Sequence, residues 1–267
     1  MATPIRQPVF IGIDLAWSSR NPTGVAALRW DGTLASLVEP LPTAALYTDD
    51  DILAFVRNVA GRGTALVAID APLTVPNLTG RRPGEAELNA VFAKFHAGAH
   101  PANRQRLAGY NGGSVRGETL VAGLAILGIR HDPMVTPHRA TRQAFEVYPH
   151  PSMVTLFGLN RILKYKAKPT ISHAQRMAEF RRYQHLLASL RGYDPPLALP
   201  KSLLSDIHLS YKGRALKAYE DQLDAVFCAY LALYYWRWGA ERCRMCGDIT
   251  KGYIVVPVDE RVVMPLQ

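Results

Sequence analysis

A buried strand that ends in an acidic residue, followed by a turn and a second strand, most constrains how this chain folds. The apolar run begins at Val9 and delivers Asp14 at its end. Asn21 and Pro22 form a turn signal before a second apolar run at residues 24–28, so the segment predicts a β-hairpin. A carboxylate at the end of a hydrophobic strand is costly unless it is solvated, capped or bound. Asp14 is therefore either a turn cap or the first member of a site.

Further elements place a second acid at a strand end. Residues 34–38 can return as a third strand, and residues 49–56 have the pattern of a helix with acids in its first turn. Residues 64–69 form the short apolar run typical of a buried strand, and Asp70 follows it. A strand that follows a helical crossover lies parallel to the first. We therefore expect Asp14 and Asp70 at one carboxyl edge, where open α/β sheets bind ligands.

The segment after Asp70 is less regular, and we interpret residues 73–142 as an insertion over the sheet edge within a single domain, residues 1–267. It holds helical patterns at 85–96 and 118–129, and a stretch at 100–116, rich in Gly, Asn and Arg, that we expect to be mobile. Its arginines suit either a substrate-gripping flap or a solvated surface loop. They are Arg81, Arg82, Arg104, Arg106 and Arg116.

Three more acids come from the second half of the chain. Residues 143–148 alternate as a strand and carry Glu146, which points either at a site or at solvent. Residues 217–238 predict a long, largely buried helix, on which Asp221 and Asp224 share one face. That face turns apolar one turn later, so the pair is hard to explain as solubilising charges. The remaining predicted elements are a helix at 172–190 and a strand at 253–258.

The predicted fold is α/β: a mixed sheet of antiparallel N-terminal strands and then parallel strands, flanked by helices. Its acids predict a site for Mg²⁺ or Mn²⁺, which prefer oxygen ligands. Two such ions, about 3.5–4 Å apart, can activate water and stabilise the leaving oxygen of a phosphodiester. The candidate catalytic residues are Asp14, Asp70, Asp221, Asp224 and Glu146, of which the first four are the candidate metal ligands. The alternative is a set of independent caps and surface acids.

A formal charge of +9 and a pI near 9.6 favour an acidic partner, most simply DNA or RNA. Three cysteines are too few for a disulfide framework, and the chain shows no signal peptide and no membrane span. We therefore expect a cytoplasmic protein, and a homodimer remains possible. The candidate substrate-binding residues are Ser18, Arg20, Asn21, Arg82, Lys164 and Lys166.

Several motifs resemble a known family: IGIDLAWS, NPTGVA, AIDAPL, FEVYPHPS and EDQLDAVFCAY. Over nearly the whole chain they are similar to the family called domain of unknown function 429, described as predicted nucleases of ribonuclease H-like fold. The resemblance implies a ribonuclease H-like sheet and a metal-binding role for Asp14, Asp70 and the Asp221/Asp224 pair. The placement of these acids also resembles that in Holliday-junction resolvases. The insertion after Asp70 departs from compact members and leaves the substrate undefined.

Two other functions remain open. An ATP-dependent enzyme of the actin/sugar-kinase-like fold also uses a strand-exit Asp, but it needs a second glycine-rich loop where this chain has Ala71 and Pro72. A non-catalytic nucleic-acid-binding protein with a vestigial site would tolerate Asp14→Asn. Cys243 and Cys246 have zinc-like spacing without a second pair. His150 follows the strand that carries Glu146, and a packing or capping role suits it best.

Overall fold

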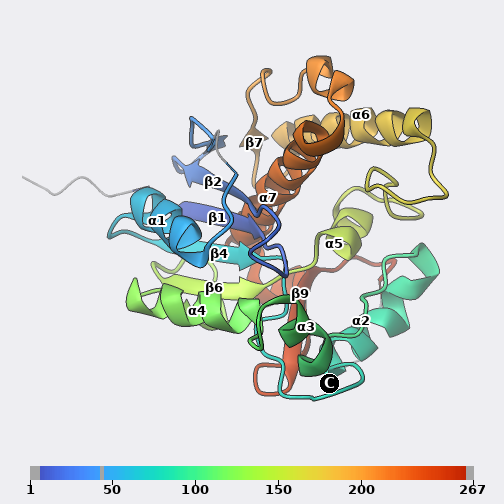
Figure 1. Ribbon diagram of the computed structural model, residues 1–267. Coiled ribbons are helices and arrows are strands. Elements are labelled where there is room, and N and C mark those ends of the chain that lie inside the picture. The colour runs from blue at the N-terminus through green and yellow to red at the C-terminus, as the bar shows by residue number, and fades with distance from the viewer. Residues whose placement is uncertain (1–6, 43–44, 263–267) are drawn as a thin grey trace, which may run out of the picture.

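A seven-stranded mixed sheet forms the centre of the protein in the computed structural model, which describes residues 7–42 and 45–262 (Figure 1). The strand order is β5-β6-β4-β1-β2-β3-β7. The first three strands in sequence pair antiparallel, whereas β4 is parallel to β1 and β6 is parallel to β4. The strands are β1 (Val9–Asp14), β2 (Gly24–Trp30), β3 (Ala35–Leu37), β4 (Ala65–Ile69), β5 (Arg130–His131), β6 (Arg142–Glu146) and β7 (Leu197–Ala198).

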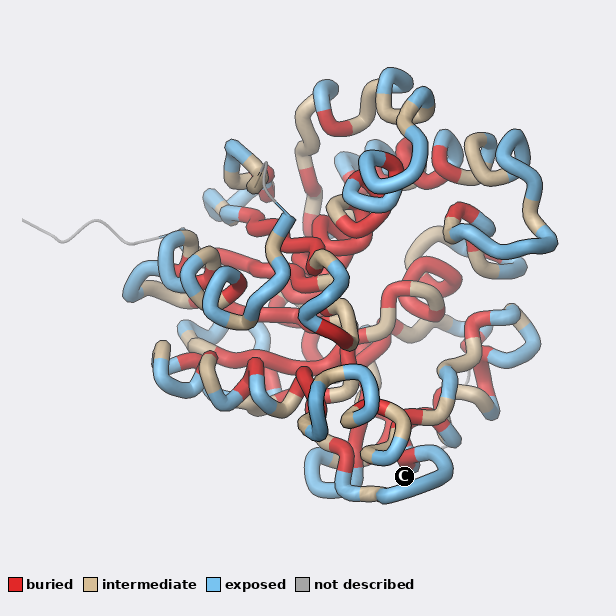
Figure 2. The backbone as a smooth tube through the Cα atoms, viewed as in Figure 1, coloured by how far each residue is buried: buried red, intermediate tan, exposed pale blue. Residues whose placement is uncertain are grey.

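Helices cover both faces of this sheet. Helix α7 (Gly213–Trp238) lies against β1, β2 and β4 on one face, and α1 (Asp49–Ala60) and α4 (Arg116–Ile126) pack on the other. The alternation of a strand divides the core accordingly: Phe10 of β1 joins the α7 side, and Ile11 joins the α1 and α4 side. Figure 2 shows this central region buried and the connecting loops exposed.

The remaining elements surround one end of the sheet. Helix α2 (Pro83–Phe92) packs on a separate hairpin, β8 (Cys243–Asp248) and β9 (Gly252–Pro257). Within residues 7–42 and 45–262, no helix has the length and apolar character needed to cross a membrane. The other helices are α3 (Arg104–Tyr110), α5 (Pro149–Leu156), α6 (His173–Ser189), and short 3-10 turns at Ala93–Phe95, Leu190–Gly192, Asp206–Ser210 and Gly239–Glu241.

The predicted mixed α/β sheet with an antiparallel N-terminal hairpin and later parallel strands is confirmed. The segment 73–142 is more than an insertion over the edge, because α4 packs on α1 and β5 extends the sheet beside β6. Residues 100–116, which we expected to be mobile, contain α3. Its N-cap is Asn103, whose side chain accepts a hydrogen bond from the backbone N–H of Arg106 at 3.0 Å.

Candidate active site

Asp14 and Asp70 leave neighbouring parallel strands at the same edge of the sheet. The backbone N–H of Asp70 donates to the carbonyl of Ile13 at 2.9 Å, so the two acids follow adjacent strand ends. Strand alternation places Asp14 with Phe10, and Asp70 with Ala68, on the face that α7 covers. The parallel pairing confirms the shared edge expected from the sequence.

Two glycines allow α7 to approach this edge closely. A Cβ atom at Gly12 would lie 1.9 Å from the carbonyl oxygen of Ala225, and one at Gly24 would lie 2.1 Å from that of Asp221. Neither position tolerates a side chain, because these neighbours are backbone atoms of a packed helix. Gly24 is also the partner of Asp14 across the β1–β2 ladder. The close packing therefore brings Asp221 of α7 beside Asp14 of β1.

The two aspartates of α7 have different surroundings. Asp221 Oδ1 accepts a hydrogen bond from Lys217 Nζ, one turn earlier, at 2.5 Å. Asp224 is fully buried, and its Oδ2 lies 2.9 Å from Lys166 Nζ. Two phenols, Tyr165 at 2.6 Å and Tyr183 at 3.2 Å, donate to Asp224 Oδ1. Asp224 is thus held from three sides, whereas Asp221 faces a cavity beside Asp14.

The acids destabilise one another's charged forms. Burial, and then the charge of Asp14, raise the pKa of Asp70 well above its usual value. Burial and Asp14 likewise raise the pKa of Asp221 to about 7, and burial raises the pKa of Asp14. Burial would lower the pKa of Lys166, but Asp224, Asp14 and Asp70 together raise it well above its usual range. Lys166 therefore stays charged and serves as the internal counter-ion of the cluster.

The donor set suits a hard divalent cation in chemistry and charge. Every candidate ligand is a carboxylate, and Asp221 Oδ2 is buried without a hydrogen-bond donor from the part of the chain that the structure describes. Among the same residues, no three Asp, Glu, His or Cys side chains are spaced to hold one ion. Lys166 and Lys217 instead supply the positive charge. A metal ion would therefore bind by drawing the carboxylates together and displacing these ammonium groups.

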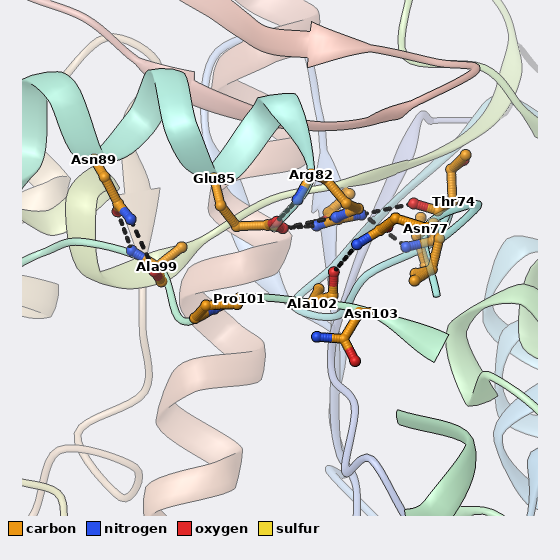
Figure 3. Close-up of polar contacts among 12 residues, drawn as sticks. Thr74, Asn77, Arg82, Glu85, Asn89, Ala99, Pro101, Ala102 and Asn103 are labelled. Atoms are coloured by element: carbon orange, nitrogen blue, oxygen red, sulfur yellow. Dashed lines mark hydrogen bonds and ion pairs between the residues drawn. The ribbon is translucent and has the colours of Figure 1, made fainter. Parts of the chain in front are cut away.

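Glu146 and Arg82 form a separate, buried ion pair, so the roles expected for them need correction. Arg82 donates to Glu146 Oε1 at 2.6 Å and Oε2 at 2.9 Å. It also pairs with Glu85, a contact shown in Figure 3. Its side chain is only 1% exposed, so it presents no surface to a phosphate. Glu146 is in register with Ile69, which packs on the α1 and α4 side of the sheet. Glu146 therefore points away from the face on which Asp14 and Asp70 lie.

An open cavity of about 410 Å³ lies over Asp14 and Asp221. Ser18, Asn21 and Lys166, three of the expected substrate contacts, line it. Arg20 and Lys164 are exposed and lie outside its lining. The other residues of its wall are Ala16, Trp17, Pro22, Tyr110 and Lys217.

A second cavity, of about 490 Å³, adjoins the first and shares Pro22 and Asp221 with it. Aromatic rings contribute to its wall, among them His208 and Tyr219, which stack with their centroids 4.3 Å apart. Apolar and aromatic surface therefore lies on both sides of the acidic cluster.

Lys217, Tyr165 and Tyr183 were not among the site residues expected from the sequence. Lys217 has a local signal, since it lies four residues before Asp221 on the helix. The tyrosines reach Asp224 only through the tertiary fold, so their sequence positions give no indication of this contact.

Burial lowers the pKa of His150 to about 3, which keeps its ring neutral. Cys243 and Cys246 lie three apart on β8, so strand alternation separates them onto opposite faces.

Most of this chain matches a known protein family. A family model described as "Protein of unknown function (DUF429)" matches residues 12–250. The chain belongs to this family. The match includes Asp14, Asp70, Asp221 and Asp224, so the whole carboxylate cluster of this DUF429 protein lies within the family region. Comparisons with curated proteins and with solved structures gave no match.

Proposed function

We propose that this DUF429 protein is a divalent-metal-dependent nuclease that hydrolyses phosphodiester bonds in DNA or RNA. The observation that carries the proposal is the convergence of Asp14, Asp70, Asp221 and Asp224 from two strand ends and one helix. Carboxylates that raise one another's pKa at the rim of an open cavity are typical of a functional site rather than of solvated surface charge.

Mg²⁺ or Mn²⁺ ions held by these four aspartates would supply an activated water and charge neutralisation at the phosphodiester. The chain's own contribution is positioning. Tyr165 and Tyr183 fix the carboxylate of Asp224 through their hydrogen bonds. Lys166 and Lys217 line the same cavity. With divalent cations bound to the carboxylates, the two ammonium groups would be free to contact the phosphate. Ser18 and Asn21 supply hydrogen-bonding groups at the cavity wall.

The overall charge of +9 supports a polyanionic substrate, because it raises the encounter rate with nucleic acid in spite of the acidic site. The cysteines of the described residues are Cys228, Cys243 and Cys246, all free thiols. Free thiols persist in a reducing compartment, so we propose the cytoplasm as the place of action.

The test is a cleavage assay with the purified full-length protein on end-labelled single-stranded and duplex DNA and RNA, with Mg²⁺ or Mn²⁺. We expect cleavage that EDTA abolishes and that Asp14→Asn reduces by about 100-fold or more. Asp14 suits this test better than Asp224, whose hydrogen bonds to two tyrosines make its replacement a packing change as well. The matched control is Asp50→Asn, which removes the same charge from an exposed position in α1.

Cleavage that survives both EDTA and Asp14→Asn would overturn the proposal. Nucleic-acid binding without cleavage under every metal condition, unchanged by Asp14→Asn, would favour a binding protein with a vestigial site. Hydrolysis of ATP instead of a polynucleotide would favour the kinase-like alternative.

A further inference from the structure

Two aromatic side chains contribute to the wall of the acidic cavity. Trp17 follows β1 three residues after Asp14, and Tyr110 ends helix α3. Their ring centroids lie 5.8 Å apart with an interplanar angle of 43°. Both rings line the same cavity as Asp14, Asp221 and Lys166. Tyr110 is 48% exposed.

A guanidinium group completes this aromatic surface. The Cζ atom of Arg106 lies 5.1 Å from the centroid of the Trp17 ring, within the range of a cation–π contact. Arg106 is one helical turn before Tyr110 on α3. Aromatic rings and a cation beside the proposed nuclease site are the elements with which proteins hold single-stranded nucleic acid. We call Trp17, Arg106 and Tyr110 the aromatic platform.

The contacts of α3 hold the platform in place. The backbone N–H of Arg104 donates to the carbonyl of Asn77 at 3.0 Å, and its side chain pairs with Glu118 of α4 at 2.7 Å. The amide of Asn77 in turn donates to the carbonyl of Ala102 at 2.9 Å, a contact visible in Figure 3. The helix is thereby fixed to the β4–α2 connection. The ring of Tyr110 is therefore held in position before any ligand arrives, which lowers the entropic cost of binding.

Trp17 itself links the platform to the protein core. It packs against a small apolar cluster formed by Val75, Ala102, Leu107 and Val115. Tyr110 takes no part in that cluster. Packing therefore accounts for Trp17 but not for the exposed ring of Tyr110, which makes Tyr110 the residue to test.

We propose that the aromatic platform stacks an unpaired nucleobase of the strand that is cleaved, so that the substrate is single-stranded or locally unpaired nucleic acid. This inference rests on the proposed nuclease function and names its substrate class. A base in a continuous duplex has both faces covered by its neighbours, so it cannot stack on a protein ring until it is extruded. Stacking uses the π-face common to all bases, so we expect little sequence preference.

The test measures binding rather than cleavage, with Ca²⁺ in place of Mg²⁺. The full-length protein is titrated into a fluorescein-labelled single strand and into the same sequence as a fully paired duplex, in DNA and in RNA. We expect Tyr110→Ala to weaken single-strand binding about tenfold or more and to leave duplex binding unchanged. Tyr110→Phe, which keeps the ring, should bind as the wild type does. Tyr47→Ala is the matched control, since Tyr47 is similarly exposed at 42% and lies outside the cavity lining.

A second readout reports stacking directly. A 2-aminopurine base in the single strand should lose fluorescence on binding the wild type or Tyr110→Phe, and should keep it with Tyr110→Ala. Equal affinity of Tyr110→Ala and the wild type for single strands, or no binding of any nucleic acid, would overturn the inference. Ring-dependent binding in a protein that never cleaves would refute the nuclease proposal and leave the platform standing. Cleavage that does not depend on the Tyr110 ring would support the nuclease proposal and refute the role of the aromatic platform.

Discussion

Gly24 of β2 lies directly against the backbone of Asp221 in α7, where a Cβ atom would come within 2.1 Å of the Asp221 carbonyl oxygen. The same glycine is the ladder partner of Asp14. One backbone contact therefore determines how closely the acid of the first strand approaches the acid of the last helix. A glycine inside a strand is often a sign of such a close approach.

We expect Gly24→Ala to lower the free energy of unfolding by about 2 kcal/mol or more, because the added methyl group must displace helix backbone. Urea denaturation of the metal-free protein measures the change. Gly192→Ala is the control, since a Cβ atom there meets no atom within 4 Å. If the two substitutions cost the same, close packing of α7 on β2 is not what holds the site together.

The metal-free protein should lose stability as the pH rises from about 4 to 7. Burial and Asp14 raise the pKa of Asp221 from its usual 3.8 to about 7 in the folded state. Between these values the folded chain retains a proton that the unfolded chain releases, so the free energy of unfolding falls with rising pH and levels off above 7. The pKa shifts of Asp14 and Asp70 have the same direction.

Asp221→Asn should remove part of this dependence of the free energy of unfolding on pH. We expect the variant to be more stable than the wild type by about 1–2 kcal/mol at pH 8 and about equal to it at pH 4. The measurement is urea unfolding in EDTA across that pH range, with Asp50→Asn as the variant that should leave the slope unchanged. A wild-type stability that rises steadily from pH 4 to 7 would contradict the electrostatics described for this cluster.

Local patterns in the sequence were sufficient to predict β1, β2, β3, β4 and β6 and the edge shared by Asp14 and Asp70. Each of these acids ends a run of apolar residues whose strand character depends on neighbours along the chain. Strands β5 and β7 have two residues each, which is too short to show an alternation of apolar and polar residues. Gly12, in the middle of β1, offered an unused signal for the close contact with α7.

Contacts between distant segments could not be read from the sequence in the same way. Alternation alone placed Glu146 opposite Phe145, but it does not tell which face of the sheet α7 covers. Alternation alone could therefore not show that Glu146 pairs with Arg82, although its charge does contribute to the raised pKa of Asp70. Likewise, the run around Lys164 and Lys166 has the pattern of a solvated basic segment, yet Lys166 enters the cluster beside Asp224 while Lys164 remains exposed.

The pairing of Glu146 with Arg82 gives a third prediction. Glu146→Gln should lower the free energy of unfolding by about 3 kcal/mol or more, because the buried guanidinium of Arg82 loses one of its two carboxylate partners. It should change Mn²⁺ affinity little, because Arg82 binds Glu146 and the charge of Glu146 raises the pKa of Asp70 less than burial and the charge of Asp14 do. Chemical denaturation and calorimetric titration with Mn²⁺ give the two quantities. Glu241→Gln, which breaks an exposed pair with Arg242, should cost less than about 1 kcal/mol. A large loss of Mn²⁺ affinity in a folded Glu146→Gln would restore Glu146 to the metal site.

Lys166 gives the last prediction, because its ammonium group neutralises the carboxylate cluster from within the protein. Its Nζ lies 2.9 Å from Asp224 Oδ2, and Asp14 and Asp70 also contribute to its raised pKa. A divalent cation at these acids must compete with this charge. We therefore expect Lys166→Met to bind Mn²⁺ about tenfold more tightly than the wild type, as measured by electron paramagnetic resonance of free Mn²⁺. Nucleic-acid cleavage by the same variant should fall, because the phosphate contact that we propose for Lys166 is lost. Lys164→Met removes an equal charge two residues away on the exposed side and should change neither quantity. If both variants bind Mn²⁺ more tightly, the overall charge of the protein explains the change, and the prediction is wrong. If only Lys166→Met does, the ammonium group and the metal ion compete for the same carboxylates.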